Sequence, residues 1–371
     1  MTSMPSTTPR LLAIGCVTPT GTLTRAGAVA LSNAVAPPST SRDLLQRFHE
    51  KSGVQSRAGV IFSASGNQSL YPPSTTEHDK GPTTQQRLHI YTQHAATLAA
   101  RAAQSALTQA GVLPSRITHL VTASCTGCHA PGVDIALIDQ LALSPDVRRT
   151  HIGFMGCHAA INSLATAAAI TTADAAACVL VVCVELCTIH MHYGNRPDQL
   201  IANALFADGA AAVIVAHSSD TSLPHAAGFA SRVFRDAQGN PTTDRMQWEI
   251  TDHGFAMTLA KDVPDLLAAS VPTWLQHTLR RYELTVHDIA TWAIHPGGPR
   301  IVQSLVQALE LSPTHQAQAT ADALAILGGH GNMSSATVLF MLYQMLQRSR
   351  HRPIITLAFG PGLAGEMMLL R

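Results

Sequence analysis

The chain has 371 residues, a formal net charge of +1, and 13% charged residues beside 46% hydrophobic ones. This length suits two domains or one large duplicated unit, and the shortage of charge, against roughly 25% in an average soluble domain, would be explained by a large subunit interface. The near-neutral balance without a basic run excludes nucleic acid as an expected partner, and the longest apolar run, AAACVLVVCV, is about half of the ~20 residues that membrane insertion of a helix requires.

The first part of the chain predicts a tail, a strand and two helices. Residues 1–10, rich in Ser, Thr and Pro, are expected to form a flexible tail, and LLAIGCV then predicts a first buried strand. Residues 43–53 have helical apolar spacing and a glycine stop, whereas residues 62–82 show no periodicity and predict a loop. Residues 85–110 predict one long helix.

From residue 119 onwards, apolar strands alternate with helices. HLVTASCTG predicts a strand that runs into a loop, PGVDIALIDQL a helix, HIGFMG a strand, and CHAAINSLATAAAI the helix that follows it. CVLVVCVEL and AAAVIVA predict two further strands. Continuous apolar and β-branched runs of this kind, alternating with helices, are typical of an α/β fold whose sheet is buried on both faces.

A second series repeats this plan towards the C-terminus. TWAIHPGGPRIVQSL predicts strand, loop and helix, GGHGNMSSATVLFMLYQML loop and helix, and PIITLAF and EMMLLR two strands. We interpret the repeat as a tandem duplication of one α/β unit, with halves over residues 11–220 and 221–371. Matching loops of two such halves lie around a pseudo-twofold axis, so Cys157, His295 and Asn332 are expected to converge in one pocket.

Cys157 lies between an apolar strand and an alanine-rich helix. A thiol in the first turn of a helix is at the positive end of the helix dipole, which favours the thiolate, and a neighbouring imidazolium lowers the thiol pKa further. This position predicts a nucleophile, although a free cysteine is more often a small buried hydrophobe. The alternatives for His295 and Asn332 are an ordinary histidine and a helix N-cap. The glycine-rich GGHGN lacks the lysine and the spacing of a P-loop.

The other cysteines show no disulfide framework. Cys16, Cys178 and Cys183 lie in apolar strands and are assigned to core packing. Cys125 and Cys128 form a single CxxC motif, for which lining a pocket is favoured over a zinc or redox site because no second CxxC lies nearby. The count of seven is odd, and LLAIG is too short for a signal peptide, so a reducing, cytoplasmic location is expected.

Five motifs in order carry a resemblance to a known family. GFMGCHAA, ALFADGAAAVIV, AIHPGGPRIV, GNMSSATVLFML and FGPGLAGEMML resemble the chalcone synthase family, the type III polyketide synthases of the thiolase superfamily. The resemblance extends from about residue 120 to the C-terminus and is loose before that. It implies the layered αβαβα thiolase fold, a homodimer, and no metal or bound cofactor.

The resemblance also implies roles for four residues. Cys157 is the expected acyl-carrying nucleophile, His295 and Asn332 are its partners, and Phe206 separates the CoA tunnel from the cavity. A starter acyl-CoA loads Cys157, malonyl-CoA is decarboxylated to an enolate that attacks the acyl group, and repeated cycles end in ring closure to a pyrone, a resorcinol or a related polyketide.

The expected pocket differs from that of the plant enzymes. SCTG and QWEI resemble bacterial enzymes that make alkylpyrones and alkylresorcinols from fatty acyl starters, which favours an aliphatic starter. For Trp248 and Met257, ordinary core packing is the alternative. The candidates for CoA binding are Arg47, Lys51 and Arg57, where a solvated helix face is the alternative. Besides Phe206, the expected pocket residues are Cys125, Thr126, Cys187, Ile189, His190, Trp248, Met257 and Ser334.

Two other functions compete with this interpretation. A ketoacyl synthase III-like enzyme shares Cys, His and Asn but makes one condensation onto acyl carrier protein, and HPGGP around His295 argues against it. A catalytically silent dimeric homologue is disfavoured because all three candidate catalytic residues are present.

Overall fold

The computed structural model describes residues 8–348 and 351–371. Its core is two sheets, each with strands that are buried on both faces. The first sheet has the order β1-β7-β6-β4-β5, with β1 (Thr8–Val17), β4 (His119–Ser124), β5 (Arg148–Gly153), β6 (Cys178–Leu186) and β7 (Asp208–Ser218). The second sheet has the order β11-β12-β13-β8, with β8 (Ala226–Val233), β11 (Thr291–Ile294), β12 (Ile354–Gly360) and β13 (Ala364–Leu370).

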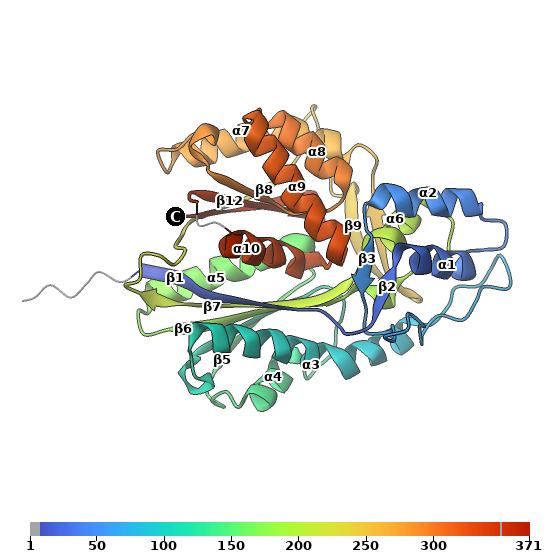
Figure 1. The fold of residues 1–371 in the computed structure, drawn as a ribbon, viewed down its shortest axis with the longest axis horizontal. Helices are drawn as coiled ribbons and strands as arrows, with labels where there is room; N and C mark the ends of the chain where they lie inside the picture. The colour runs from blue at the N-terminus through green and yellow to red at the C-terminus, as the bar shows by residue number, and fades with distance from the viewer. Residues whose placement is uncertain (1–7, 349–350) are drawn as a thin grey trace, which may run out of the picture.

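Helices form the other three layers of the predicted αβαβα arrangement (Figure 1). Two helices, α5 (Ala159–Ala173) and α10 (Thr337–Arg348), lie between the sheets. The outer face of the first sheet is covered by α3 (Thr84–Ala110) and α4 (Val133–Leu141). The outer face of the second sheet is covered by α7 (Val263–Arg280), α8 (Pro299–Ala308) and α9 (Pro313–His330).

The duplication is visible in the strand pairing. In the first half β4 is parallel to β6, which is antiparallel to β7, and β7 is antiparallel to β1. In the second half β11 is parallel to β12, which is antiparallel to β13, and β13 is antiparallel to β8. The second sheet has no counterpart of β5 among the described residues, because α9 precedes Asn332 where a strand precedes Cys157. The expected boundary near residue 220 lies between β7 and β8.

The predicted helices have clear local causes. The long helix α3 begins with a capping box, in which Thr83 and Gln86 satisfy each other's backbone N–H groups, and ends at Gly111 with φ of 64°. Helix α2 (Arg42–Ser52) begins at the N-cap Ser41 and stops at Gly53, whose φ is 78°. Both helices were predicted to within one residue.

Three sequence expectations need correction. The expected tail is shorter than residues 1–10, because residues 8–10 pair in β1, while residues 1–7 lie outside the described part. The strand expected from HIGFMG begins at Arg148 and ends at Gly153. The first two glycines of GGHG, Gly328 and Gly329, are not in a loop, since α9 continues to His330 and only Gly331 follows it.

Smaller elements gather at one end of the molecule, at the right of Figure 1. They comprise β2 (Thr22–Thr24), α1 (Arg25–Val35), α2, β3 (Ser56–Ala58), α6 (Pro197–Leu205) and a hairpin of β9 (Met246–Thr251) and β10 (Gly254–Leu259). Within the described ranges no helix is long and apolar enough to cross a bilayer.

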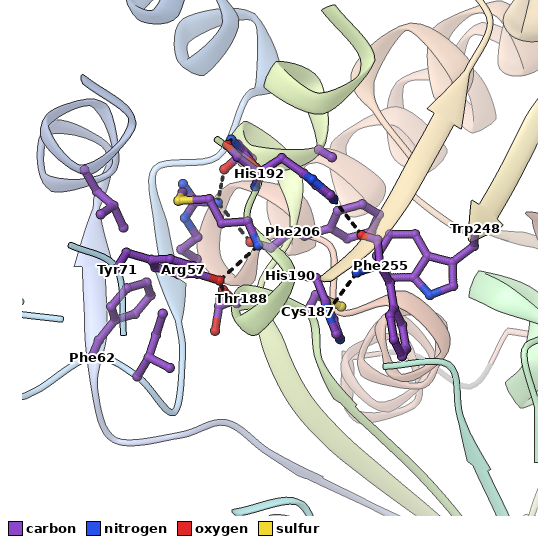
Figure 2. Close-up of a pocket in the computed structure, with 15 residues that line it drawn as sticks. Arg57, Phe62, Tyr71, Cys187, Thr188, His190, His192, Phe206, Trp248 and Phe255 are labelled. Atoms are coloured by element: carbon purple, nitrogen blue, oxygen red, sulfur yellow. Dashed lines mark hydrogen bonds between the residues drawn. The ribbon is translucent and has the colours of Figure 1, made fainter. Parts of the chain in front are cut away.

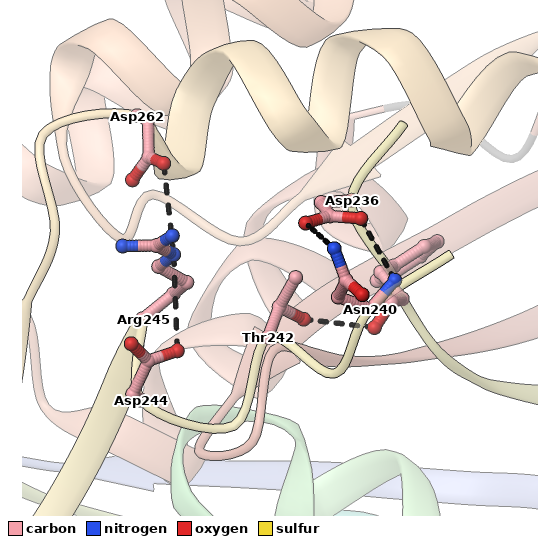
Figure 3. A network of polar contacts seen from close by, with 7 residues as sticks. Asp236, Asn240, Thr242, Asp244, Arg245 and Asp262 are labelled. Atoms are coloured by element: carbon pink, nitrogen blue, oxygen red, sulfur yellow. Dashed lines mark hydrogen bonds and ion pairs between the residues drawn. The ribbon is translucent and has the colours of Figure 1, made fainter. Parts of the chain in front are cut away.

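An ion cluster ties this hairpin to α7. Arg245, directly before β9, lies between Asp244 and Asp262, with its Nε 3.8 and 3.7 Å from their carboxylate oxygens (Figure 3). The Ala260 N–H also donates to the Arg245 carbonyl at 2.8 Å. Exposed ion pairs of this kind contribute little to stability, about 0–1 kcal/mol.

Candidate active site

Cys157 lies in a short turn, Gly156–His158, between β5 and α5. Gly156 has a φ of 72°, and a Cβ added there would lie 2.3 Å from Pro361 Cδ. A side chain at position 156 is therefore excluded both by backbone conformation and by the close approach of the turn after β12. The turn that carries Cys157 is therefore seated directly on the second half of the fold.

A small cavity of about 50 Å³ lies at Cys157. It brings together many of the predicted pocket residues, whose segments are far apart in the chain. Its walls also include Met246, Gly156, Gly360 and Pro361, which the sequence analysis did not single out. The predicted residues that line it are Cys125, Thr126, Cys157, Cys187, Phe206, Trp248, Met257 and Ser334.

Asn332 is fixed beside this cavity. Its backbone N–H donates to Leu205 O and its carbonyl accepts from Ala207 N, both at 2.9 Å, which makes a bridge to Phe206. Its side-chain Oδ1 accepts from the Ser334 N–H at 2.9 Å. The amide N–H group is thereby turned to Cys157, whose sulfur interacts with the side chains of both Asn332 and Ser334. The structure thus brings Cys157 and Asn332 into contact.

His295 follows β11 and is 1% exposed. Its backbone N–H donates to Leu357 O at 2.8 Å, but neither ring nitrogen has a hydrogen-bond partner among the described residues. A Cβ built on Gly297 would lie 4.0 Å from His295 Nε2. The imidazole therefore lies behind the glycine pair 297–298 with unused hydrogen-bonding capacity, which is what a group that binds a substrate atom needs.

Burial acts against charge on both groups. It raises the pKa of Cys157 to about 12, although side-chain hydrogen bonds from Ser334 and Asn332 lower that pKa. Burial lowers the pKa of His295 to about 3, and the nearby His158 lowers it further. These directions oppose the helix-dipole argument, which favours a thiolate at Cys157. With no substrate bound, the cavity favours a neutral thiol and a neutral imidazole.

A buried carboxylate organises the cavity wall from behind. Glu185, the last residue but one of β6, is 0% exposed and has no cationic partner among the described residues. It accepts from Ser335 Oγ at 2.5 Å, Thr126 Oγ1 at 2.8 Å, Cys125 N at 3.0 Å and Cys125 Sγ at 3.2 Å. Burial raises the Glu185 pKa, and these hydrogen bonds lower it.

Sequence reasoning missed the role of Glu185, although a signal was present. A single carboxylate in the otherwise apolar strand CVLVVCVEL is unusual, because a charge is rarely buried unless it is paired or hydrogen-bonded. Cys125 links Glu185 to the residue that interacts with Cys157. Its sulfur lies 3.2 Å from the Glu185 carboxylate and 3.5 Å from Ser334 Oγ.

A second, smaller cavity of about 20 Å³ lies behind the first, and Cys187, Phe206 and Trp248 line both. Figure 2 shows His190, Phe255 and Trp248 grouped at this partition. The His190 ring stacks on Phe255 with centroids 4.1 Å apart and meets Trp248 edge-on at 5.9 Å. The Trp248 indole N–H donates to Cys125 O at 2.7 Å. Trp248 is therefore a fixed wall between the two cavities.

His190 is a neutral imidazole that two backbone groups hold in this wall. Its Nε2 is 2.8 Å from Thr126 O, and its Nδ1 accepts from the Phe255 N–H at 3.1 Å. Burial lowers the His190 pKa to about 3. Ile189, also predicted to line the pocket, lines neither cavity and packs in the core below the first sheet.

An outer groove of about 240 Å³ runs on the far side of Phe206. Leu205 lines this groove while Phe206 lines the inner cavity, so this short segment separates the two spaces. The groove floor is apolar, and its positive charges come from Lys51, Lys261 and Arg300. The glycine pair 297–298 in front of His295 also belongs to it.

The three predicted CoA-binding residues have different positions. Lys51 lines the groove, and Arg47 is exposed one turn earlier on α2. The prediction for Arg57 conflicts with the structure, because Arg57 is 3% exposed and donates through Nη1 to Asn203 O at 2.6 Å and Phe206 O at 2.9 Å. Arg57 supports the Phe206 segment from the interior. Sequence reasoning missed Lys261 and Arg300, which the fold brings to the groove.

All seven cysteines are free. Cys178 and Cys183 are buried, and Cys16 packs against the core, as predicted. Cys125 is buried in the cavity wall while Cys128 is exposed, so the CxxC motif does not form a pair. In residues 8–348 and 351–371 no group of three His, Cys, Asp or Glu side chains is placed to hold a metal ion.

Comparisons with known proteins agree with this geometry. The N-terminal domain of "Chalcone and stilbene synthases" matches residues 4–219, and the C-terminal domain of the same family matches residues 238–371. The solved structure of PKS-I from the brown alga Ectocarpus siliculosus has a TM-score of 0.90 at 28% identity and covers 100% of this chain and 99% of that one.

Two curated relatives are similar in sequence. "Alpha-pyrone synthesis polyketide synthase-like Pks18" of Mycobacterium tuberculosis is 30% identical over 332 residues, which cover 88% of this chain and 82% of that protein. "Type III polyketide synthase 21" of Oryza sativa is 30% identical over 349 residues, which cover 92% of this chain and 87% of that protein.

Proposed function

This chain belongs to the chalcone and stilbene synthase family and is a type III polyketide synthase, and we propose that it carries the growing chain on Cys157 with His295 and Asn332 as its partners. The observation that carries this assignment is the interaction of the Cys157 sulfur, at the inner cavity, with the Asn332 side chain. His295 does not line that cavity but is buried behind Gly297 with both ring nitrogens unpartnered among the described residues. The enzyme is an acyltransferase whose extension step is a decarboxylative condensation.

Loading begins when an acyl-CoA thioester reaches Cys157. The sulfur attacks the thioester carbonyl, His295 takes the thiol proton, and the CoA thiolate leaves with that proton as free CoA. His295 is neutral because burial lowers its pKa, so its unpartnered ring nitrogen is free to accept the proton in this step. The product is an acyl group bound to Cys157 by a thioester.

Extension uses malonyl-CoA in the same site. The His295 N–H and the Asn332 amide N–H hold the malonyl thioester oxygen, so that the enolate formed when CO₂ leaves is stabilised. The enolate carbon then attacks the acyl carbonyl on Cys157, which releases the sulfur and lengthens the chain by two carbons. Thioester exchange returns the chain to Cys157 for the next cycle. The cycle draws on CoA thioesters alone and uses no bound cofactor or metal.

The outer groove is the proposed binding site for CoA. Lys51, Lys261 and Arg300 supply positive charge for the CoA phosphates, and the apolar floor suits the pantetheine arm. The groove ends at the glycine pair in front of His295, and Phe206 stands between the groove and the cavity. Arg47, exposed on the same helix as Lys51, is a further candidate at its rim.

The proposed product is a pyrone made from an aliphatic starter. The inner cavity is small and is lined by sulfur and apolar groups, and the Trp248 wall shortens it. Aromatic starters need wider space beside Cys157 than aliphatic ones do. A resorcinol from the same intermediates is the second candidate product, since it needs a different ring closure of the same chain.

A homodimer is proposed from the edge of the first sheet. β5 is an edge strand with four exposed residues, and the adjoining Phe154 and Met155 are 39% and 38% exposed. An exposed strand edge beside large apolar side chains is a surface that a second copy covers by pairing its own β5. Seven free cysteines suit a reducing cytoplasm, which is the proposed location.

The decisive experiment is an incubation of the purified protein with malonyl-CoA and each of a set of acyl-CoAs, from acetyl to stearoyl and including aromatic ones, followed by mass spectrometry. Pyrone or resorcinol masses are expected with wild type and not with Cys157→Ala. Absence of both product and acyl-enzyme with every starter would reject the assignment of Cys157, and carrier-protein substrates would then be tested.

A further inference from the structure

His158, the residue directly after the nucleophile, takes no part in the cycle described above. It is nevertheless 2% exposed, at the end of the turn that carries Cys157. A buried imidazole is costly unless its polar atoms have partners, so its contacts indicate what holds it there.

Two elements from different halves of the fold hold the His158 ring. Its Nδ1 lies 2.7 Å from Asn162 Oδ1, one helical turn further along α5. Its other edge packs on Gly360 at the end of β12, where an added Cβ would lie 2.6 Å from Cδ2 and 3.0 Å from Nε2. The ring therefore fills a space that exists because residue 360 has no side chain.

Burial keeps His158 neutral, against the effect of the nearby Glu366 carboxylate. Burial lowers the His158 pKa, whereas Asn162 and the Glu366 carboxylate in β13 raise it. Glu366 is itself held by the Ser231 hydroxyl at 2.6 Å, and on the other side His158 acts on His295. A neutral ring whose Nδ1–H donates to Asn162 Oδ1 satisfies this contact.

We propose that His158 is a positioning residue for Cys157: its hydrogen bond to Asn162 and its seat on Gly360 fix the nucleophile turn between the two halves of the fold. The need for such a clamp follows from the turn itself, because Gly156 has φ of 72° and cannot restrain the thiol from the other side through a side chain. The inference rests on the proposed function, since it takes Cys157 as the nucleophile.

Two substitutions of His158 distinguish the role of its hydrogen bond from the role of its packing. A leucine at 158 fills much of the same space but has no donor for Asn162, whereas a glutamine keeps an N–H donor. If the hydrogen bond positions the turn, His158→Leu and Asn162→Leu remove the same interaction, and their effects on Cys157 do not multiply when they are combined.

The test measures the rate of single-turnover acylation of Cys157 by acetyl-CoA and by hexanoyl-CoA, read as intact-protein mass, in folded variants matched by thermal melting. We expect His158→Leu and Asn162→Leu each to slow acylation about tenfold or more, as small misplacements of a reacting group do. The double variant is expected to be no slower than either single one, and His158→Gln to recover to within about threefold of wild type. The control is His119→Leu, which changes the first residue of β4, whereas the cavity residue Cys125 follows the last residue of that strand. This variant should leave the acylation rate unchanged.

The outcomes distinguish the inference from the proposed function. Wild type that takes no acyl group on Cys157 from either thioester contradicts the proposed function. Wild type that acylates normally, with His158→Leu or Asn162→Leu equally fast, overturns the clamp. Multiplying effects in the double variant, or a Gln variant as slow as the Leu variant, also overturn it. If His158→Leu does not fold, Asn162→Leu and His158→Gln still decide the question.

Discussion

Replacement of Glu185 tests the reasoning about the cavity wall most directly. Glu185→Leu removes the acceptor of the Ser335 and Thr126 hydroxyls and of the Cys125 backbone N–H, all of them buried. Glu185→Gln keeps the shape of the side chain and one oxygen, so it still accepts hydrogen bonds from some of these donors.

The loss of stability in Glu185→Leu follows from the number of buried hydrogen-bond donors that lose their acceptor. Leaving a buried donor without a partner costs about 1–3 kcal/mol, so three of them cost roughly 3–9 kcal/mol, which approaches the whole stability of a typical protein. Relief from burying a carboxylate without a cation offsets part of this cost. We therefore expect Glu185→Leu to be mostly unfolded or insoluble, and Glu185→Gln to fold with a free energy of unfolding lower by about 1–3 kcal/mol.

The pH dependence separates the acid from its amide. Because burial raises the pKa of Glu185 in the folded state, the folded protein binds the proton more tightly than the unfolded chain does. The stability that this proton contributes is complete below the unfolded pKa of about 4.3 and is lost as pH rises through the higher folded pKa. Glu185→Gln lacks this component.

Urea unfolding followed by tryptophan fluorescence, at pH values from about 4.5 to about 8, measures both effects. The stability advantage of wild type over Glu185→Gln is expected to shrink as pH rises through this window. An advantage that grows with pH would mean that hydrogen bonds outweigh burial and hold the folded Glu185 pKa below its usual value. Unchanged stability in Glu185→Leu would refute the network itself.

Three further predictions concern the wall, the groove and the dimer. Trp248→Ala should join the two cavities and shift products to longer starters or more extensions, and an unchanged product spectrum would contradict the wall. Lys261→Ala and Arg300→Ala should each raise KM for malonyl-CoA severalfold with little change in kcat, because lost CoA contacts weaken ground state and transition state alike. Unchanged KM values in both variants would remove the groove as the CoA site. If the proposed homodimer forms over β5, Met155→Lys should shift it to monomer in sedimentation, since a lysine beside the paired edge places an unpaired charge in the interface, and a persistent dimer would place the interface elsewhere.

Much of the fold could be predicted because buried strands and helix ends have recognisable residue patterns in the sequence. The strand CVLVVCVEL is apolar except for Glu185, and a glycine directly after an amphipathic run, such as Gly53, marks the end of a helix. The duplication then predicted that the corresponding loops of the two halves share one site. The contact between Cys157 and Asn332 follows from that symmetry.

The positions of charged residues were harder to predict, because burial of a charge depends on partners that are distant in the chain. Arg57 resembles a groove residue in sequence, yet its partners are carbonyls of residues 203 and 206, almost 150 positions away. Lys261 and Arg300 belong to the second half of the chain, and the fold places them in one groove with Lys51 and Leu205 of the first half. No local pattern encodes either fact.

The charge states of Cys157 and His295, the proposed nucleophile and its partner, can be judged from the size of their pKa shifts. With the thiol pKa at about 12 and the imidazole pKa at about 3, moving the proton from Cys157 to His295 costs on the order of 12 kcal/mol at about 1.4 kcal/mol for each pKa unit. Even an ion pair at about 4 Å would return only about 4 kcal/mol at an effective dielectric constant of about 20. Water in the cavity lowers the cost further, but the neutral pair is still favoured when no substrate is bound. In the proposed cycle, proton transfer to His295 is therefore coupled to attack of the Cys157 sulfur on the thioester rather than preceding it.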